Sequence, residues 1–289
     1  MSKSAIVVKS VGGVFAVMDG QGKKTVCYSP KKFRFKDSDV IIGDAVLFDP
    51  LKNGKGVITE VLPRKNKLAR PEIANVDVCF IVAADEPAPD FYLVDKVLIN
   101  CFQEKIYPVI VVNKSDLSDK TLLSAQEDYG SVADIVSVSA FDGSASVLKK
   151  YLDGKTACFA GQSAVGKTSL LNALLPEAYG EIGALSLKTG RGMHTTRHAT
   201  LHRAYGGFIA DTCGFSLCDL AGIRSDELRL YLDDMVELSR DCRYGSCTHT
   251  VEPDCAVRSA VKEGKLSEKR YNRYVEEYNE LCEFEKNQY

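Results

Sequence analysis

The distribution of hydrophobic residues divides the 289-residue chain into three parts. Residues 1–68 contain short apolar runs separated by Gly, Asn, Asp and Pro at close spacing, which is typical of a small antiparallel barrel. From residue 76 the apolar runs are unbroken, as in "VDVCFIVAAD", and helix-like segments lie between them. Such runs indicate a parallel sheet that helices cover on both faces. The last part is mostly helical and polar. We therefore expect three domains, at residues 1–68, 69–220 and 221–289.

Composition restricts the class of protein. The chain is 45% hydrophobic, but none of its apolar runs approaches the roughly 20 residues of a membrane-spanning helix. The run "AIVV" near the N-terminus is too short for an export signal. Most of the ten cysteines stand singly inside apolar runs, as reduced thiols do in cytosolic proteins. We expect a cytoplasmic protein that makes no membrane contact.

The net charge of −2 hides an asymmetry between the two ends of the chain. Residues 1–70 carry 14 Lys and Arg against 6 Asp and Glu, so their net charge is +8 and that of the remainder is −10. A solvated surface would also account for this excess. A polyanionic partner is favoured, because the positive charge belongs to one predicted domain.

A phosphate-binding loop occupies the middle of the chain. The sequence "GQSAVGKTSL" matches G-x-x-x-x-G-K-[ST], follows the strand-like "TACFA" and opens a helix-like segment, which is the context that this motif requires. Its backbone N–H groups would surround phosphate oxygens, while Lys167 would reach the β- and γ-phosphates. The residues expected to bind GTP here are Gly161, Gln162, Ser163, Ala164, Val165, Gly166, Lys167, Thr168 and Ser169.

A second motif indicates guanine as the base. Asn113, Lys114 and Asp116 form N-K-x-D after the apolar run "VIVV". A carboxylate at this point can accept from guanine N1–H and the 2-amino group, whereas adenine has no such pair of donors. The alternative is a simple turn after a strand. It loses weight because "VSVSA" follows at the next strand end, where the backbone of Ser139 and Ala140 would contact the guanine oxygen.

The remaining parts of a GTPase site lie after the phosphate loop. Asp211 and Gly214 form D-x-x-G at a strand end, which would hold Mg²⁺ through water and offer an N–H to the γ-phosphate. Thr168 would bind Mg²⁺ directly. A glycine-rich polar segment precedes Asp211, and either Thr195 or Thr196 would close on Mg²⁺ when a γ-phosphate is present.

The order of these motifs is unusual, because Asn113 precedes Gly161. In ordinary small GTPases the phosphate loop comes first, so we predict a circularly permuted domain. Permutation is tolerated because the ends of compact domains often lie close together. As a consequence, D-x-x-G leads almost directly into the C-terminal part, and we hypothesise that γ-phosphate sensing reaches that part through the chain.

Three cysteines and one histidine cluster near the C-terminus in the pattern C-x4-C-x-H-x5-C. This set is typical of a closed, tetrahedral structural zinc site. A disulfide is the alternative, but the cytosol is reducing and one cysteine would be left over. The expected ligands are Cys242, Cys247, His249 and Cys255.

Taken together, these motifs resemble the RsgA/YjeQ family of circularly permuted GTPases of bacterial small-subunit assembly. The resemblance runs through "VLPRKNKLARPEIANVD", "NKSD", "GQSAVGKTSLLNAL", "GRGMHTT", "DTCGF" and "CRYGSCTHTVEPDCAV", in that order. It implies an all-β OB-fold barrel, a permuted α/β P-loop GTPase domain and a mostly helical zinc module. It also implies weak GTP hydrolysis that the small subunit stimulates. Cys213 departs from the family, where proline is usual.

The residue that orients the attacking water is not the usual one. Phe215 follows Gly214, where Ras-like enzymes have the glutamine that positions water. His194 is the nearest polar candidate; a neutral imidazole can orient water near pH 7, and the matching position in the resembled family is considered catalytic. The alternative is an exposed histidine in a flexible loop.

We therefore expect a GTPase that binds the 30S subunit and assists its late maturation, with rRNA contacts through the basic barrel. Its cofactors would be one structural Zn²⁺ and the Mg²⁺ that accompanies GTP. A monomer suits a one-to-one encounter with a subunit. Two alternatives remain at this point: an RNA-binding chaperone in which GTP is only a conformational ligand, and a P-loop kinase for a small molecule.

Overall fold

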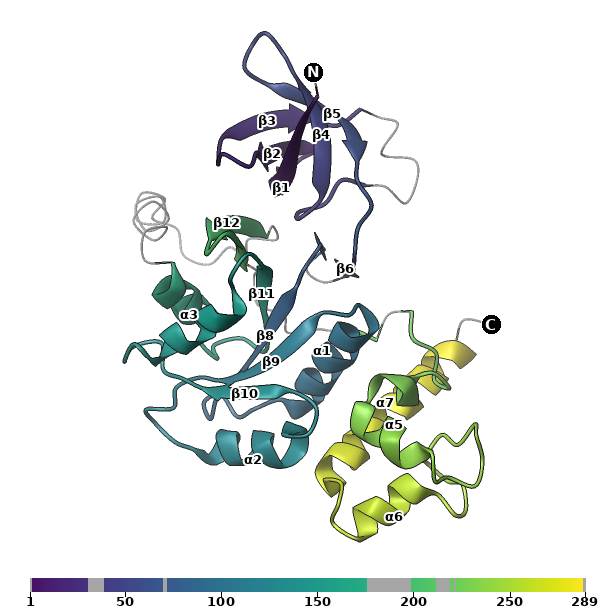
Figure 1. Cartoon of the computed structure of the whole chain (residues 1–289). Helices are drawn as coiled ribbons and strands as arrows, with labels where there is room; N and C mark the ends of the chain where they lie inside the picture. Colours follow the sequence, from purple (N-terminus) through teal and green to yellow (C-terminus); the bar gives the residue numbers. More distant parts are fainter. Residues whose placement is uncertain are drawn as a thin grey trace.

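The computed structural model describes residues 2–30, 39–69, 72–175, 199–211, 219–220 and 222–287. Figure 1 shows three parts in a row: a barrel of the first five strands, a central sheet flanked by helices, and a group of helices that ends with the C-terminus. The predicted fold class is confirmed, with a closed five-stranded barrel, later helices and a Cys/His cluster near the C-terminus. The domain boundaries at residues 68 and 220 stay predictions.

The barrel consists of five short strands that close on themselves. The hydrogen-bonded order is β1-β2-β3-β5-β4, and β4 pairs again with β1. All pairs are antiparallel except β3 with β5; this is the Greek-key barrel of the OB-fold. Alternate side chains such as Val7, Val17 and Ile58 are fully buried inside it. The strands are β1 (Lys3–Val11), β2 (Val14–Met18), β3 (Lys24–Tyr28), β4 (Ala45–Pro50) and β5 (Gly56–Val61).

The central sheet has the order β10-β9-β8-β11-β13-β12. Its strands are parallel except for β12, which is antiparallel to β13. The strands are β8 (Val78–Ala83), β9 (Tyr107–Val112), β10 (Asp134–Ser137), β11 (Thr156–Ala160), β12 (Thr200–Ala204) and β13 (Gly207–Asp211).

Helices cover both faces of this sheet, which explains its unbroken apolar strands. Every residue of β8 is buried; Cys79 and Ile81 belong to the core under α1 and α2, and Phe80 and Val82 to the core under η2 and α3. The helices are α1 (Phe91–Gln103), α2 (Lys120–Tyr129), the 3₁₀ helix η2 (Ser144–Tyr151) and α3 (Lys167–Leu174). The strands β8, β9 and β10, which include the one before N-K-x-D, thus precede β11, the strand before G-x-x-x-x-G-K-[ST], in the chain.

The barrel meets the central sheet at strand β12. Lys9 of β1 is paired with Thr200 of β12, and the Arg203 guanidinium donates to the carbonyl of Gly20 in the barrel at 3.1 Å. The short hairpin of β6 (Lys67–Leu68) and β7 (Ile73–Ala74) lies along the connection between the two parts. The strand that leads toward Asp211 therefore contacts the barrel directly.

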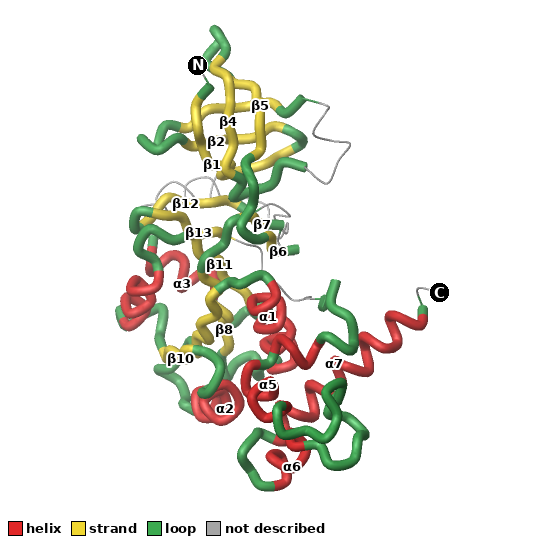
Figure 2. Tube along the Cα trace, turned by 45° about the vertical axis from the view of Figure 1, so that its right-hand side comes forward, coloured by secondary structure: helices red, strands yellow, loops and turns green. Residues whose placement is uncertain are grey.

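The C-terminal part packs against α1 and α2 through its last helix, as Figure 2 shows. Lys96 of α1 forms an ion pair with Glu280 at 2.7 Å, and Arg273 pairs with Asp95 and, at 2.9 Å, with Asp128. The elements of this part are η3 (Leu228–Tyr231), α5 (Asp233–Ser239), α6 (Ala256–Lys262) and α7 (Glu268–Lys286). Across the described ranges, we find no helix with the length and apolar character that a bilayer crossing requires.

Candidate functional site

The phosphate loop begins where β11 ends and leads into α3 at Lys167. Two glycines allow its close packing. A Cβ on Gly161, where φ is +125°, would lie 2.2 Å from the Val82 carbonyl oxygen, and a Cβ on Gly166, where φ is +97°, would lie 2.2 Å from Asn113 Nδ2. Any side chain at either position would push the loop away from the neighbouring strand ends.

Lys167 lies over its own loop. Its ammonium donates to the carbonyl oxygens of Gly161 at 2.7 Å and Gln162 at 2.5 Å. Burial lowers the pKa of this lysine to about 8, because a charged ammonium loses hydration there. Thr168, beside it in the first turn of α3, is exposed, and Ser169 is half-buried.

Gln162 connects the phosphate loop to the start of α1. Its side-chain oxygen accepts from the Asp90 N–H at 2.8 Å, and its amide nitrogen donates to the Ala88 carbonyl at 3.0 Å. Asp90 is also the residue whose side chain caps α1 by accepting from the Leu93 N–H. The motif predicted only a phosphate-binding role for Gln162. Its bonds to Ala88 and Asp90 could not be predicted, because those residues are distant in the sequence.

The N-K-x-D residues lie against the phosphate loop. The Asn113 side chain is buried and donates to the Val165 carbonyl at 2.8 Å. The Lys114 ammonium donates to the carbonyls of Ala164 at 3.0 Å and Glu86 at 2.5 Å. The Lys114 stem therefore crosses the space between these two loops. Asp116 is exposed beside them.

The loop after β10 lies next to the N-K-x-D loop. The Ser115 N–H donates to the Val138 carbonyl at 3.1 Å, which fixes the two loops side by side. The Ser139 N–H donates to Ser144 Oγ at 2.7 Å, so the turn that follows is held by its own side chains. The loop of Ser139 and Ala140 therefore lies beside the loop of Asn113, Lys114 and Asp116.

Asp211 lies at the end of β13, in line with the phosphate loop. Burial raises the pKa of its carboxyl, and the nearby His202 opposes that shift. Burial lowers the pKa of His202, which lies on the neighbouring strand β12. The other predicted residues of this region, His194, Thr195, Thr196, Cys213, Gly214 and Phe215, lie outside the described residues.

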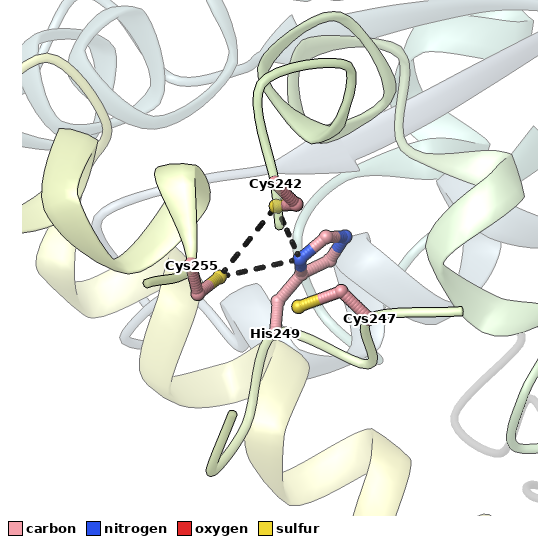
Figure 3. Close-up of side chains that lie close together, drawn as sticks. All are labelled: Cys242, Cys247, His249 and Cys255. Carbon is pink, nitrogen blue, oxygen red and sulfur yellow. Dashed lines mark hydrogen bonds between the residues drawn. The ribbon is translucent and has the colours of Figure 1, made fainter. Parts of the chain in front are cut away.

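The four predicted metal ligands come together in one cluster, shown in Figure 3. The ligand atoms of Cys242, Cys247, His249 and Cys255 all lie within 4.8 Å of one another. His249 Nδ1 lies 3.6 Å from the sulfur of Cys242 and 3.4 Å from that of Cys255. A tetrahedron built on Zn–S bonds has edges of about 3.8 Å, so these separations fit a bound zinc ion. Burial raises the pKa of Cys247 to about 12.

Residues that the sequence did not single out shape the metal loop. Burial alone would raise the pKa of Glu252, but hydrogen bonds from Thr248 and Thr250 outweigh it and lower the pKa to about 2. Its carboxylate accepts from the Thr248 N–H at 2.6 Å. The Tyr271 hydroxyl on α7 donates to the His249 carbonyl at 2.8 Å. These bonds hold His249 at a φ of +63°, where a non-glycine residue is uncommon.

The fold and both sites can be compared with known proteins. The sequence model of the RsgA GTPase family matches residues 61–221. The chain belongs to the RsgA GTPase family. It is 38% identical to "Small ribosomal subunit biogenesis GTPase RsgA" of Geobacillus sp. (strain WCH70), covering 96% of this chain and 97% of that protein. A protein of the same name from Thermotoga petrophila is 37% identical, covering 97% of each chain.

Solved structures of RsgA-type proteins agree over the full length. The crystal structure of YjeQ from Thermotoga maritima is 34% identical, with a TM-score of 0.83 over 98% of this chain and 99% of that chain. YloQ, described as a circularly permuted GTPase, is 32% identical, with a TM-score of 0.80 over 98% and 96%. The permutation predicted from the motif order is therefore confirmed, and the protein is a GTP hydrolase.

Membership of the RsgA family decides between the alternatives for the reaction. The family and the permuted GTPase structures support hydrolysis of GTP, so the P-loop kinase is no longer a candidate. The roles of single residues are separate predictions. The predicted guanine and phosphate residues come from loops that hydrogen bonds join to one another, whereas the Cys/His cluster belongs to the C-terminal part.

Proposed function

We propose that this GTPase binds the small ribosomal subunit, assists its late maturation, and hydrolyses GTP to GDP and phosphate faster on the subunit. The observation that carries the proposal is the full-length similarity to proteins named for small ribosomal subunit biogenesis. The barrel, the permuted domain and the Cys/His cluster are all included in that similarity. A chaperone that only binds GTP would lack turnover on the subunit.

In this proposal one set of residues binds the guanine base of GTP and another set binds its phosphates. Asp116 accepts from the two guanine donors, Asn113 braces the loops, and the Lys114 stem lies along the base. The N–H groups of residues 161–169 surround the phosphates, and Lys167 turns from its own loop toward the β- and γ-phosphates. The backbone of Ser139 and Ala140 contacts the guanine oxygen.

Mg²⁺ with GTP supplies charge neutralisation at the phosphates. Thr168, in the first turn of α3, would bind the ion through its hydroxyl, and Asp211, at the end of β13, would hold the water on the ion. Thr195 or Thr196 closes on the ion, Gly214 offers its N–H to the γ-phosphate, and His194 orients the attacking water. These last residues lie outside the described part, and their roles rest on the motifs.

The Cys/His cluster holds one structural zinc ion. Zinc supplies a tetrahedral cross-link there and no open coordination position. The three thiolates and Nδ1 of His249 provide the whole ligand set, because their atoms already lie within 4.8 Å of one another. The ion would thereby join the loop of Cys242, Cys247 and His249 to Cys255 at the N-terminus of α6.

The proposed binding partners are inferred from the positive charge of the N-terminal part and from membership of the RsgA family. Residues 1–61, which form the barrel, carry 10 Lys and Arg against 6 Asp and Glu, which is half of the positive excess of residues 1–70. The barrel would contact rRNA phosphates. The stretch "KKFRFK" lies in the undescribed range 31–38, whereas Lys23 and Lys24 are described and exposed. We propose a monomer in the cytoplasm, where small subunits are assembled.

A charge-reversal experiment tests the proposed subunit contact. The double variant Lys23→Glu/Lys24→Glu should co-sediment with purified small subunits roughly tenfold more weakly and with a shallower salt dependence, because phosphate contacts release counterions. The matched control is the exposed neighbouring pair Lys149 and Lys150 on η2, changed to glutamate in the same way. Equal binding of both variants would remove the barrel from the contact, and absence of any co-sedimentation of the wild type would contradict the proposed function.

A further inference from the structure

Phe141 is a large apolar side chain without a place in the core. It is 85% exposed, the highest value among the described large hydrophobic residues. Its ring makes no aromatic contact within the described ranges. The sheet has two apolar cores close by, under η2 and under α2, and Phe141 belongs to neither. Packing of the fold therefore does not explain a phenylalanine here.

Its position in the chain is next to the guanine loop. Phe141 directly follows Ser139 and Ala140, and its N–H donates to Ser139 Oγ at 3.3 Å. Ser139 is in turn bonded to Ser144, so the backbone that carries the ring is held by a compact turn. The Ala140 N–H makes no hydrogen bond in the described structure, which leaves it available to a ligand acceptor.

Lys114 belongs to the adjacent N-K-x-D loop, which the hydrogen bond from the Ser115 N–H to the Val138 carbonyl joins to the segment that leads to Phe141. Its ammonium is tied to the Ala164 and Glu86 carbonyls, so its methylene stem can cover only one face of a planar base. The Phe141 loop comes from the next strand over, beside the N-K-x-D loop. The second face of a base bound at these loops needs another side chain to cover it, and Phe141 is an exposed aromatic residue on the adjoining loop.

We propose that Phe141 stacks on the guanine face opposite the Lys114 stem and thereby sets how tightly the site holds GDP and GTP. The inference rests on the proposed assignment of Asn113, Lys114 and Asp116 to the guanine. Stacking requires a flat apolar ring that gives up water on binding, which an exposed phenylalanine provides. Stacking by Phe141 would not depend on the guanine N–H groups that Asp116 accepts from, because every base has a π-face.

The test measures nucleotide affinity by calorimetry for wild type, Phe141→Ala and Phe284→Ala. Phe284 is the matched control, an exposed phenylalanine on α7 (61% exposed). Loss of one aromatic–base stack should weaken GDP binding roughly 5- to 150-fold in Phe141→Ala, while Phe284→Ala stays close to wild type. Inosine diphosphate, which lacks the 2-amino group, should lose the same factor as GDP.

A fluorescence reporter gives a second measurement. The chain contains no tryptophan, so Phe141→Trp introduces a single one, and bound GDP should quench its emission while Phe284→Trp emission is unchanged. The inference is overturned if Phe141→Ala binds GDP within about twofold of wild type, or if the loss for GDP exceeds that for inosine diphosphate, which would mean that Phe141 acts through Asp116. Failure of the underlying assignment looks different: wild type would then not prefer GDP to ADP.

Discussion

At the scale of single residues, burial lowers the pKa of Lys167, the lysine of the predicted phosphate loop, to about 8. The motif alone identified it, but its environment came from the structure: the ammonium is buried over the carbonyls of its own loop. A phosphate that replaces those carbonyls stabilises the charged form, so the pKa in the complex lies above the value of the free protein. Nucleotide affinity is therefore linked to pH.

We predict that GDP affinity is independent of pH below about 8 and decreases above it, by at most about tenfold per pH unit until the pKa of the complex is reached. Below the free-state pKa of about 8 the lysine is already protonated, so no proton has to be taken up. Calorimetry from pH 6.5 to 9.5 measures this. Lys167→Arg remains charged throughout, so the ratio of the two affinities removes any titration of the nucleotide. A ratio that is constant with pH would contradict the prediction.

Other residue-level features were beyond the sequence. Asp116 and Lys167 could be proposed from the sequence because their motifs have fixed spacing. Gln162 was found only as a motif position, since its bonds to Ala88 and Asp90 join segments that are distant in the chain. Glu252 carries no motif at all, although it fixes the turn that presents His249.

At the scale of elements, a buried ionic interface joins α7 to α1 and α2. The Arg273 side chain is 14% exposed, and its partners Asp95 and Asp128 are 4% and 2% exposed. Its guanidinium also donates to the Tyr129 hydroxyl at 3.0 Å. The polar pattern of the last helix did not predict this interface, because buried charges look like surface charges in a sequence.

We predict that Arg273→Met lowers the free energy of unfolding by about 3–5 kcal/mol. The buried Asp95 would then face the more distant Arg270 guanidinium at 4.0 Å, and the buried Asp128 would accept from the Ser267 hydroxyl without a cation. Urea denaturation followed by circular dichroism measures it. Lys269→Met, on the same helix, is the control. The Lys269 side chain is 70% exposed and its ammonium lies 3.9 Å from Glu127, so its loss should cost less than about 1 kcal/mol. Similar losses for both variants would show that the interface contributes no more than a surface ion pair.

The second prediction at this scale concerns zinc binding by the Cys/His cluster. We expect elemental analysis to find about one zinc per chain, and Cys247→Ser to lose the metal together with hydrogen-exchange protection of α6. GDP binding should persist, because the core beneath the phosphate loop is separate from that of the C-terminal helices. Cys282→Ser, on α7 outside the cluster, should retain the metal. A wild-type protein with far less than one zinc would refute the assignment.

At the scale of the whole molecule, the sequence predicted the fold class and the permutation, because both depend on the order of motifs and on unbroken apolar strands. It did not predict how the parts meet. The pairing of Lys9 with Thr200 and the bond from Arg203 to Gly20 join the barrel to β12, next to the strand of Asp211. The residues in these contacts belong to no recognisable sequence motif, so the contacts could not be predicted from the sequence. The transmission of γ-phosphate sensing to the C-terminal part stays a prediction.

The most direct test of the central claim is steady-state phosphate release from GTP and ATP, with and without purified small ribosomal subunits, with Lys167→Ala as the blank. The account predicts release from GTP alone, strongly increased by small subunits, and a stimulated rate that falls roughly tenfold or more in His194→Ala while nucleotide affinity is kept. GTP binding without increased turnover on the subunit, or equal release from ATP, would contradict it.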